Sequence, residues 1–141
     1  LVQLLYELKH FNVKNNSIQS IFIGGGTPST VDPILFKPLF DLIKPMLQKN
    51  IEITTEANPN SATKEWIKGM KSLGVNRISF GVQSFNNEKL KMLGRAHNKE
   101  SAIQAIKSAK ELGIENISLD LIYATNMDTN KLLQNDLDIA F

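Results

Sequence analysis

The segment Ile78-Ser79-Phe80-Gly81-Val82-Gln83 decides the fold, because apolar residues alternate in it with small or polar ones. Successive side chains of a β-strand point to opposite faces of its sheet. One face of this segment is therefore apolar and the other is polar. The same alternation appears in Ile51–Glu56 and in Ile117–Tyr123. The pattern predicts a sheet with one face covered by helices and one face that holds small and polar groups.

A fourth apolar run, Ile21–Ile23, precedes these strands, and helical periodicity separates the later ones. The helical positions are Trp66, Ile67, Met70 and Leu73 in one stretch, and Ala102, Ile103, Ile106 and Ala109 in another. Strands that alternate with helices form βα units and a parallel sheet. A doubly wound sheet is apolar on both faces, and a closed eight-stranded barrel has an apolar interior. We therefore expect an α/β fold of the partial parallel (β/α) barrel type with an open, polar lumen, containing about four strands of a larger core.

Several residues mark where the helices begin and end. Lys71–Ser79 and Lys110–Ser118 share a pattern in which Gly74 or Gly113 ends a helix just before a strand. The predicted N-caps are Ser61, Asn86 and Asn98. Asp32-Pro33 is predicted to open a further helix, which Pro38 and Pro45 should break or delay.

The two ends of the chain suggest a piece of a longer protein. The first residue is Leu1 and not Met, and helical spacing of leucines runs up to both ends. Four strands cannot close a barrel. We therefore interpret residues 1–141 as a fragment of one barrel domain, with a first strand and a carboxy-terminal domain outside it.

The composition excludes several classes of protein. The 141 residues contain no cysteine and only two histidines, so we expect neither disulfides nor a metal site within the chain. A formal net charge of +2 provides no electrostatic case for binding nucleic acid or a membrane surface. We see no apolar run long enough to span a bilayer and no secretory leader. These features predict a cytoplasmic protein.

The glycines of Gly24-Gly25-Gly26-Thr27-Pro28 follow the first strand directly. Consecutive glycines allow backbone groups to approach a ligand closely, although a tight turn between strand and helix explains them equally well. The run matches neither a phosphate loop nor the dinucleotide fingerprint. Glu56 ends the second strand. Its carboxylate could bind a ligand ammonium or hydroxyl, or it could be a solvated acid.

Three further candidates lie on the third and fourth strands and after the helix between them. Gln83 ends the third strand, where its amide could bind a ligand or orient the next loop. Asp120 lies within the fourth strand and needs a partner or a ligand. Arg95 follows Gly94 at a predicted helix end, where compensation of the helix dipole is the simpler interpretation. For His97 the simplest interpretation is a lone surface histidine.

Together these candidates are stronger evidence for a binding site than any one of them, because they come from four successive strands at the same end of the sheet. Ligands bind at that end in parallel βα folds. The set contains no obvious nucleophile and no histidine base. It therefore favours binding of a small polar ligand whose chemistry a cofactor supplies.

Five motifs in order resemble a known family. They are Ile21–Pro28, Glu56–Pro59, Gly81–Phe85, Leu93–His97 and Asn116–Tyr123. Together they resemble radical S-adenosylmethionine (SAM) proteins of the oxygen-independent coproporphyrinogen III oxidase type. Leu93-Gly94-Arg95-Ala96-His97 looks more like the heme-chaperone (HemW-type) branch than like the true oxidases. The resemblance covers nearly the whole chain.

This resemblance implies a partial (β/α)6 barrel and a set of ligands for SAM. It implies that the loop of Gly24, Gly25, Gly26 and Thr27 contacts the methionine amino group. It implies that Glu56 and Arg95 hold the methionine end, and that Gln83 and Asp120 bind the ribose hydroxyls. Arginine suits a carboxylate because its donors form a planar fork.

The chain departs from the family in two places. The three-cysteine motif that holds a 4Fe-4S cluster is absent, so we predict that the chain alone is inactive and that the cluster belongs to an intact parent. The family's Gly-Leu-Pro-Gly after Leu-Ile-Tyr is replaced here by Ala124–Asp128.

Three hypotheses for the function follow. The first is the central part of a radical SAM protein related to coproporphyrinogen III oxidase, in porphyrin or heme metabolism. The second is a heme chaperone that binds and transfers heme without oxidase activity. The third is an unrelated βα-barrel fragment. The first two imply SAM, and a porphyrin or heme, as small-molecule partners, and they leave the electron donor or heme acceptor unidentified.

Overall fold

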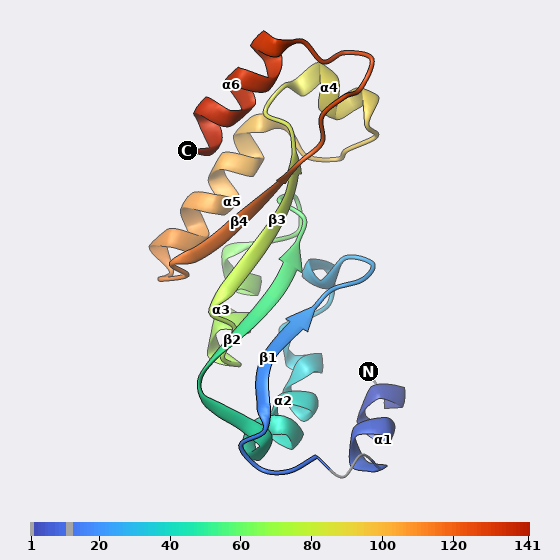
Figure 1. The fold of residues 1–141 in the computed structure, drawn as a ribbon, viewed down its shortest axis with the longest axis vertical. Helices are drawn as coiled ribbons and strands as arrows, with labels where there is room; N and C mark the ends of the chain where they lie inside the picture. Colours follow the sequence, from blue (N-terminus) through green and yellow to red (C-terminus); the bar gives the residue numbers. More distant parts are fainter. Residues whose placement is uncertain (1, 11–12) are drawn as a thin grey trace.

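The computed structural model describes residues 2–10 and 13–141, and four parallel strands form its centre (Figure 1). The strands are β1 (Ile18–Ile23), β2 (Leu47–Ala57), β3 (Arg77–Gln83) and β4 (Asn116–Leu121). They form one sheet in the order β1-β2-β3-β4. The predicted parallel sheet is confirmed, with three corrections to the bounds: β1 and β2 begin earlier than predicted, and β4 ends at Leu121.

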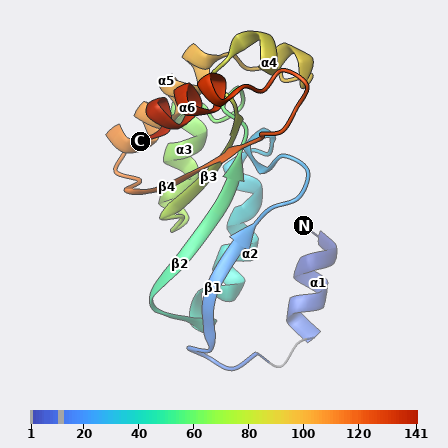
Figure 2. The same ribbon diagram turned by 45° about the horizontal axis from the view of Figure 1, so that its top comes forward.

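The strand register brings the polar residues together. Ser79 is opposite Glu56 on β2 and Ser118 on β4, and Gln83 is opposite Leu121 after a shift in the register. Among the described residues, β1 and β4 each pair on one side only. The sheet is therefore open, and its carboxyl-terminal strand ends share one edge (Figure 2).

Helices and short 3-10 turns connect the strands. The helices are α1 (Val2–His10), α2 (Lys37–Ile43), α3 (Lys64–Ser72), α4 (Asn87–Met92), α5 (Lys99–Glu111) and α6 (Asn130–Ala140). The 3-10 turns are η1 (Pro28–Thr30), η2 (Pro33–Phe36) and η3 (Lys44–Met46). In this set no helix is both long and apolar enough to cross a bilayer.

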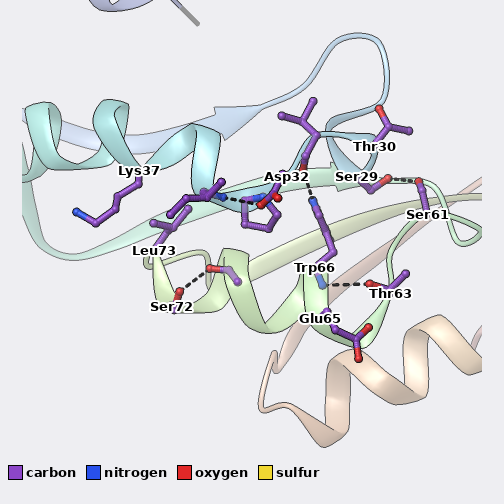
Figure 3. A pocket seen from close by; sticks show the side chains of 14 residues that line it. Ser29, Thr30, Asp32, Lys37, Ser61, Thr63, Glu65, Trp66, Ser72 and Leu73 are labelled. Atoms are coloured by element: carbon purple, nitrogen blue, oxygen red, sulfur yellow. Dashed lines mark hydrogen bonds between the residues drawn. The ribbon is translucent and has the colours of Figure 1, made fainter.

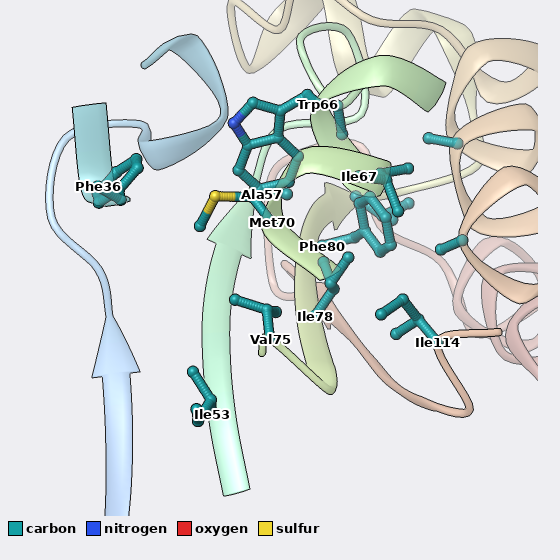
Figure 4. Close-up of a cluster of buried hydrophobic side chains, with 14 of the residues drawn as sticks. Phe36, Ile53, Ala57, Trp66, Ile67, Met70, Val75, Ile78, Phe80 and Ile114 are labelled. Atoms are coloured by element: carbon teal, nitrogen blue, oxygen red, sulfur yellow. The ribbon is translucent and has the colours of Figure 1, made fainter. Parts of the chain in front are cut away.

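The apolar face of the sheet packs against α2, α3 and α5 (Figure 4). Ile78, Phe80 and Val82 of β3 are 0% exposed, and so are Ile67 and Met70 of α3. Full burial of each such side chain contributes about 1.5–3 kcal/mol. This core confirms the alternation predicted for the third strand, and it leaves the opposite face free for polar side chains.

Most of the predicted helix ends are confirmed. Asn86 and Asn98 cap α4 and α5, and Asp32 caps the short turn η2. The prediction for Ser61 was wrong, because α3 begins later and Thr63 caps it by accepting from the amide of Trp66 at 3.1 Å. Ser61 lies in a preceding turn, where its hydroxyl bonds to Ser29.

The segment with Pro38 and Pro45 is broken, as predicted. A 3-10 turn runs directly into the short helix α2, and Pro45 lies in a second 3-10 turn. Gly74 and Gly113 have φ values of 109° and 77°, which is the left-handed backbone expected after a helix. Of the leucines at the amino terminus, Leu1 lies outside the described residues.

Candidate functional site

A pocket of about 250 Å³ opens on the polar face, at the carboxyl ends of the strands. Its lining residues are Gly26, Thr27, Pro28, Glu56, Ala57, Asn58, Ser79, Gly81, Gln83, Arg95 and Asp120. All the predicted binding residues therefore line this pocket except Gly24 and Gly25, which lie in the loop beside it. Residues distant in sequence converge here because all four strands run in the same direction.

The glycine loop packs directly against Glu56. The amide of Gly25 donates to Oε2 of Glu56 at 3.2 Å. A Cβ on Gly24 would lie 2.6 Å from the ring of Phe22 and 3.0 Å from Cδ of Glu56. Gly25 and Gly26 have φ values of 84° and 60°, which favour glycine. The loop therefore makes the tight turn that one interpretation predicted, and it brings the Gly25 amide to the Glu56 carboxylate.

A second contact, which sequence reasoning missed, fixes the end of this loop. Ser29 is 4% exposed, and its hydroxyl accepts from the amide of Asn58 at 2.9 Å. It also bonds to the hydroxyl of Ser61 at 2.6 Å. The residues after Thr27 are therefore tied to those just after Glu56.

Gln83 and Arg95 lie together over Gly81. A Cβ on Gly81 would be 3.0 Å from Nε2 of Gln83 and 3.4 Å from Nη2 of Arg95. Nη2 of Arg95 donates to the carbonyl of Gly81 at 3.2 Å, while its Nε is buried without a partner. Gln83 has a φ of 68°, a conformation that costs a non-glycine residue roughly 1–2 kcal/mol. The glycine at position 81 leaves room for both side chains.

The expectation that His97 is a lone surface histidine was wrong. His97 is 4% exposed, and its Nε2 lies 2.8 Å from the carbonyl of Val82. Burial lowers the pKa of His97; the bond to Val82 opposes this, and the charge of Arg95 adds to it. A neutral ring donates from Nε2 to this carbonyl, whereas its buried Nδ1 has no partner. His97 therefore fixes the segment that carries Arg95.

Asp120, which was expected to need a partner or a ligand, is exposed on the edge strand β4. Its one hydrogen bond among the described residues comes from the hydroxyl of Ser79 at 3.4 Å. Ser118 donates in turn to Ser79 at 3.0 Å. Ser79 is therefore the partner of this carboxylate within the described residues, and the rest of the carboxylate faces the open polar face.

Arg77 fills the other end of the polar face. Its guanidinium donates to the hydroxyls of Thr54 at 3.3 Å and Ser118 at 3.1 Å, and it lies 3.7 Å from Glu52. A row of polar groups therefore runs from Arg77 to Asp120. Sequence alternation predicted this face for Ser118, but the position of Arg77 was missed.

A wider groove of about 770 Å³ lies between the segment 29–37 and α3 (Figure 3). There Nε1 of Trp66 donates to the carbonyl of Val31 at 3.0 Å. None of the predicted binding residues lines this groove. In residues 2–10 and 13–141, no three His, Asp or Glu side chains gather to hold a metal ion, and the chain has no cysteine.

Comparison with known proteins identifies the family of the chain. Residues 1–138 match the model of the radical SAM superfamily. The chain belongs to this superfamily. Membership implies SAM and a 4Fe-4S cluster as the cofactors of the complete domain.

Curated relatives point to one branch of the superfamily. The chain is 41% identical over 142 residues to the heme chaperone HemW of Haemophilus influenzae, which covers 98% of this chain and 36% of that protein. It is 42% identical over 112 residues to HemW of Escherichia coli, which covers 78% of this chain and 30% of that protein. The chain thus spans about a third of the length of these relatives.

Solved structures agree with the fold. Coproporphyrinogen III oxidase (HemN) from Escherichia coli, described as a radical SAM enzyme, superimposes with a TM-score of 0.77 and 27% identity. The match covers 87% of this chain and 29% of that one. The archaeal Elp3 of Methanocaldococcus infernus, at a TM-score of 0.74 and 20% identity, supports the fold alone. The chain is therefore part of a radical SAM protein related to HemN.

Proposed function

We propose that the pocket at the strand ends binds SAM. The observation that supports this proposal is the convergence of four kinds of polar group on one pocket of about 250 Å³. These are a glycine loop, a carboxylate on β2, an amide on β3 with a nearby guanidinium, and a carboxylate on β4. SAM presents an ammonium, a carboxylate and a ribose diol, and each has a complementary group here.

In this proposal Glu56 and Arg95 bind the methionine end of SAM. The Glu56 carboxylate already accepts from the Gly25 amide at 3.2 Å, and it keeps further acceptor capacity for an ammonium. The guanidinium of Arg95 makes one bond to the Gly81 carbonyl, and its buried Nε has no partner. A carboxylate that approaches Arg95 would meet donors in a planar fork.

Gln83 and Asp120 bind the ribose hydroxyls, and the loop of Gly24, Gly25, Gly26 and Thr27 closes over the methionine amino group. The exposure of Asp120 supports this role, since an accessible carboxylate can accept from a hydroxyl donor of a ligand. The glycines contribute by keeping Cβ atoms out of the space next to Glu56.

In the complete domain a 4Fe-4S cluster would supply the reducing power for the chemistry of SAM. The chain contains no cysteine, so its own residues do not fit the cluster, and the thiolates would come from outside it. The residues of this chain bind and orient SAM, and we expect the chain alone to be inactive.

For the complete protein we propose a role in porphyrin or heme metabolism, as in its relatives HemN and HemW. A heme chaperone is the second candidate, and two observations favour it. They are the curated relatives named HemW and the resemblance of the segment Leu93–His97 to the heme-chaperone branch.

Two assays on the protein encoded by the complete reading frame test these roles. The first measures SAM binding by equilibrium dialysis, with the cluster reconstituted without oxygen. Glu56→Gln should weaken binding, whereas Glu52→Gln, on the same strand and face but away from the pocket, should not. Equal affinity of both variants and the wild type would contradict the site.

The second assay separates the two candidate roles. The oxidase predicts anaerobic conversion of coproporphyrinogen III to protoporphyrinogen IX. The chaperone predicts heme binding, seen as a Soret band, without this conversion. Turnover would reject the chaperone, and heme binding without turnover would reject the oxidase.

A further inference from the structure

A buried carboxylate on α6 reaches the strand end next to the pocket. Asp136 is 1% exposed. Its Oδ2 accepts from the hydroxyl of Ser84 at 2.7 Å, and its Oδ1 accepts from the amide of Phe85 at 2.7 Å. Within the part of the chain that the structure describes, no lysine, arginine or histidine pairs with it. A buried charge without a counterion is retained only where donors satisfy it.

The two donors belong to the turn that directly follows Gln83. The amide of Ser84 donates to the carbonyl of Val82 at 2.9 Å. Its hydroxyl also accepts from the amide of Asn86 at 3.0 Å, which leads into the cap of α4. Asp136 therefore fixes both the turn and the start of the segment that connects β3 to α5.

This connecting segment has a lining residue of the pocket near each of its ends. It leaves from Gln83 and returns at Arg95. The return is fixed by His97, which bonds to the carbonyl of Val82 at 2.8 Å. The carbonyl of Gln83 accepts from the amide of Ile122 at 2.9 Å, so the residue directly after β4 holds the other side of Gln83.

The conformation of Gln83 explains why such an anchor is needed. Its φ of 68° is one that an isolated glutamine rarely adopts. Such a conformation persists where surrounding contacts determine it. Ser84 and Phe85 are 0% and 3% exposed, so solvent cannot replace the bonds that Asp136 accepts.

We propose that Asp136 is a positioning residue that acts through Gln83: it holds the Ser84–Phe85 turn and so aims the Gln83 amide into the pocket. The proposal rests on the assignment of Gln83 as a ligand of the SAM ribose. It adds a residue from α6, on a different element from every predicted ligand.

The test compares Asp136→Ala with Asp138→Ala in the protein encoded by the complete reading frame. Asp138 lies on the same helix, is exposed, and accepts a bond from Gln134 at 2.7 Å. We expect Asp136→Ala to raise the Kd for SAM about tenfold and to speed amide exchange in residues 83–86 by a similar factor. Asp138→Ala should change neither.

A double-mutant cycle with Gln83→Ala separates positioning from general destabilisation. If Asp136 acts through Gln83, the two losses of SAM affinity do not add, because the second change removes a contact that is already lost. Additive losses would overturn the proposal. If Asp136→Ala does not fold, Ser84→Ala removes one of the two bonds to Asp136, together with the bond from the Asn86 amide, and should give effects in the same direction.

The outcomes also distinguish this proposal from the proposed function. If the wild type binds no SAM, the proposed function fails together with the ligand role of Gln83, whereas faster exchange at 83–86 still supports the anchor. If the wild type binds SAM but both Asp136→Ala and Ser84→Ala bind and exchange like the Asp138→Ala control, the positioning role is overturned.

Discussion

Gly24→Ala is the substitution that most sharply probes the contact between the glycine loop and Glu56. The new Cβ would lie 2.6 Å from the ring of Phe22 and 3.0 Å from Cδ of Glu56. Phe22 is 61% exposed, so its ring can move into solvent at little cost. The Glu56 carboxylate must also shift, and it then loses the bond from the Gly25 amide at 3.2 Å.

The size of the effect follows from that bond. A hydrogen bond to a charged group contributes about 1.5–3 kcal/mol. If the displaced carboxylate loses a comparable bond to the SAM ammonium, affinity falls roughly 10- to 100-fold. Thermal stability should change little, because both displaced groups are side chains that are not fully buried.

Equilibrium dialysis with labelled SAM measures the affinity, and differential scanning calorimetry measures the stability. Phe22→Ala is the control, because it removes one of the two close contacts. The double variant Phe22→Ala/Gly24→Ala should still bind weakly, since the contact with Glu56 remains. Wild-type affinity of Gly24→Ala would refute the reasoning, and so would recovery of affinity in the double variant.

Three further predictions concern stability. Thr63→Ala should lower the free energy of unfolding by about 0.5–2 kcal/mol in urea denaturation, because it removes the cap of α3; an unchanged midpoint would contradict this. Since burial lowers the pKa of His97 below its usual 6.5, the unfolded chain takes up its proton first, and stability should fall as pH drops below about 6.5. His97→Gln should reduce the dependence of the unfolding free energy on pH. An unchanged dependence in this variant would contradict the role of His97. The bond from Lys89 lowers the pKa of Asp128 to about 2. Asp128→Asn should therefore destabilise the protein at pH 7, and this effect should disappear as pH falls from 3.8 towards 2. An equal loss of stability at about pH 7 and about pH 2 would show that the charge of Asp128 is not its cause.

Alternation along the strands was sufficient to predict the sheet and its polar face. Ile78, Phe80 and Val82 are fully buried, while Ser79, Gly81 and Gln83 line the pocket. This succeeds because a strand has a period of two, and each side chain is committed to one face by its position alone. The convergence at one edge then follows from parallel strand direction.

The sequence could not predict contacts that depend on a distant partner. Ser61 and Thr63 are both capping residues by type, yet Thr63 caps α3 while the hydroxyl of Ser61 bonds to the distant Ser29. The residues around His97 in the sequence do not predict its burial, yet His97 is 4% exposed and its Nε2 bonds to the carbonyl of Val82. Asp136 reads as one of several acids on an amphipathic helix until α6 is seen to lie over the Ser84–Phe85 turn.

The exposure of Asp120 was not predicted, for a different reason. An acid within an apolar strand is costly only if its face is covered. The polar face of β4 is open, and no further strand among the described residues pairs with β4. Composition and alternation predict which face a residue occupies, but they do not say how much protein covers that face.

The most direct test of the account is a structure of the protein encoded by the complete reading frame with SAM bound. The account predicts that the SAM ammonium lies within hydrogen-bonding distance of Glu56 and the glycine loop, and its carboxylate near Arg95. The ribose hydroxyls should lie near Gln83 and Asp120. SAM bound elsewhere, for example in the groove beside Trp66, would contradict the central claim.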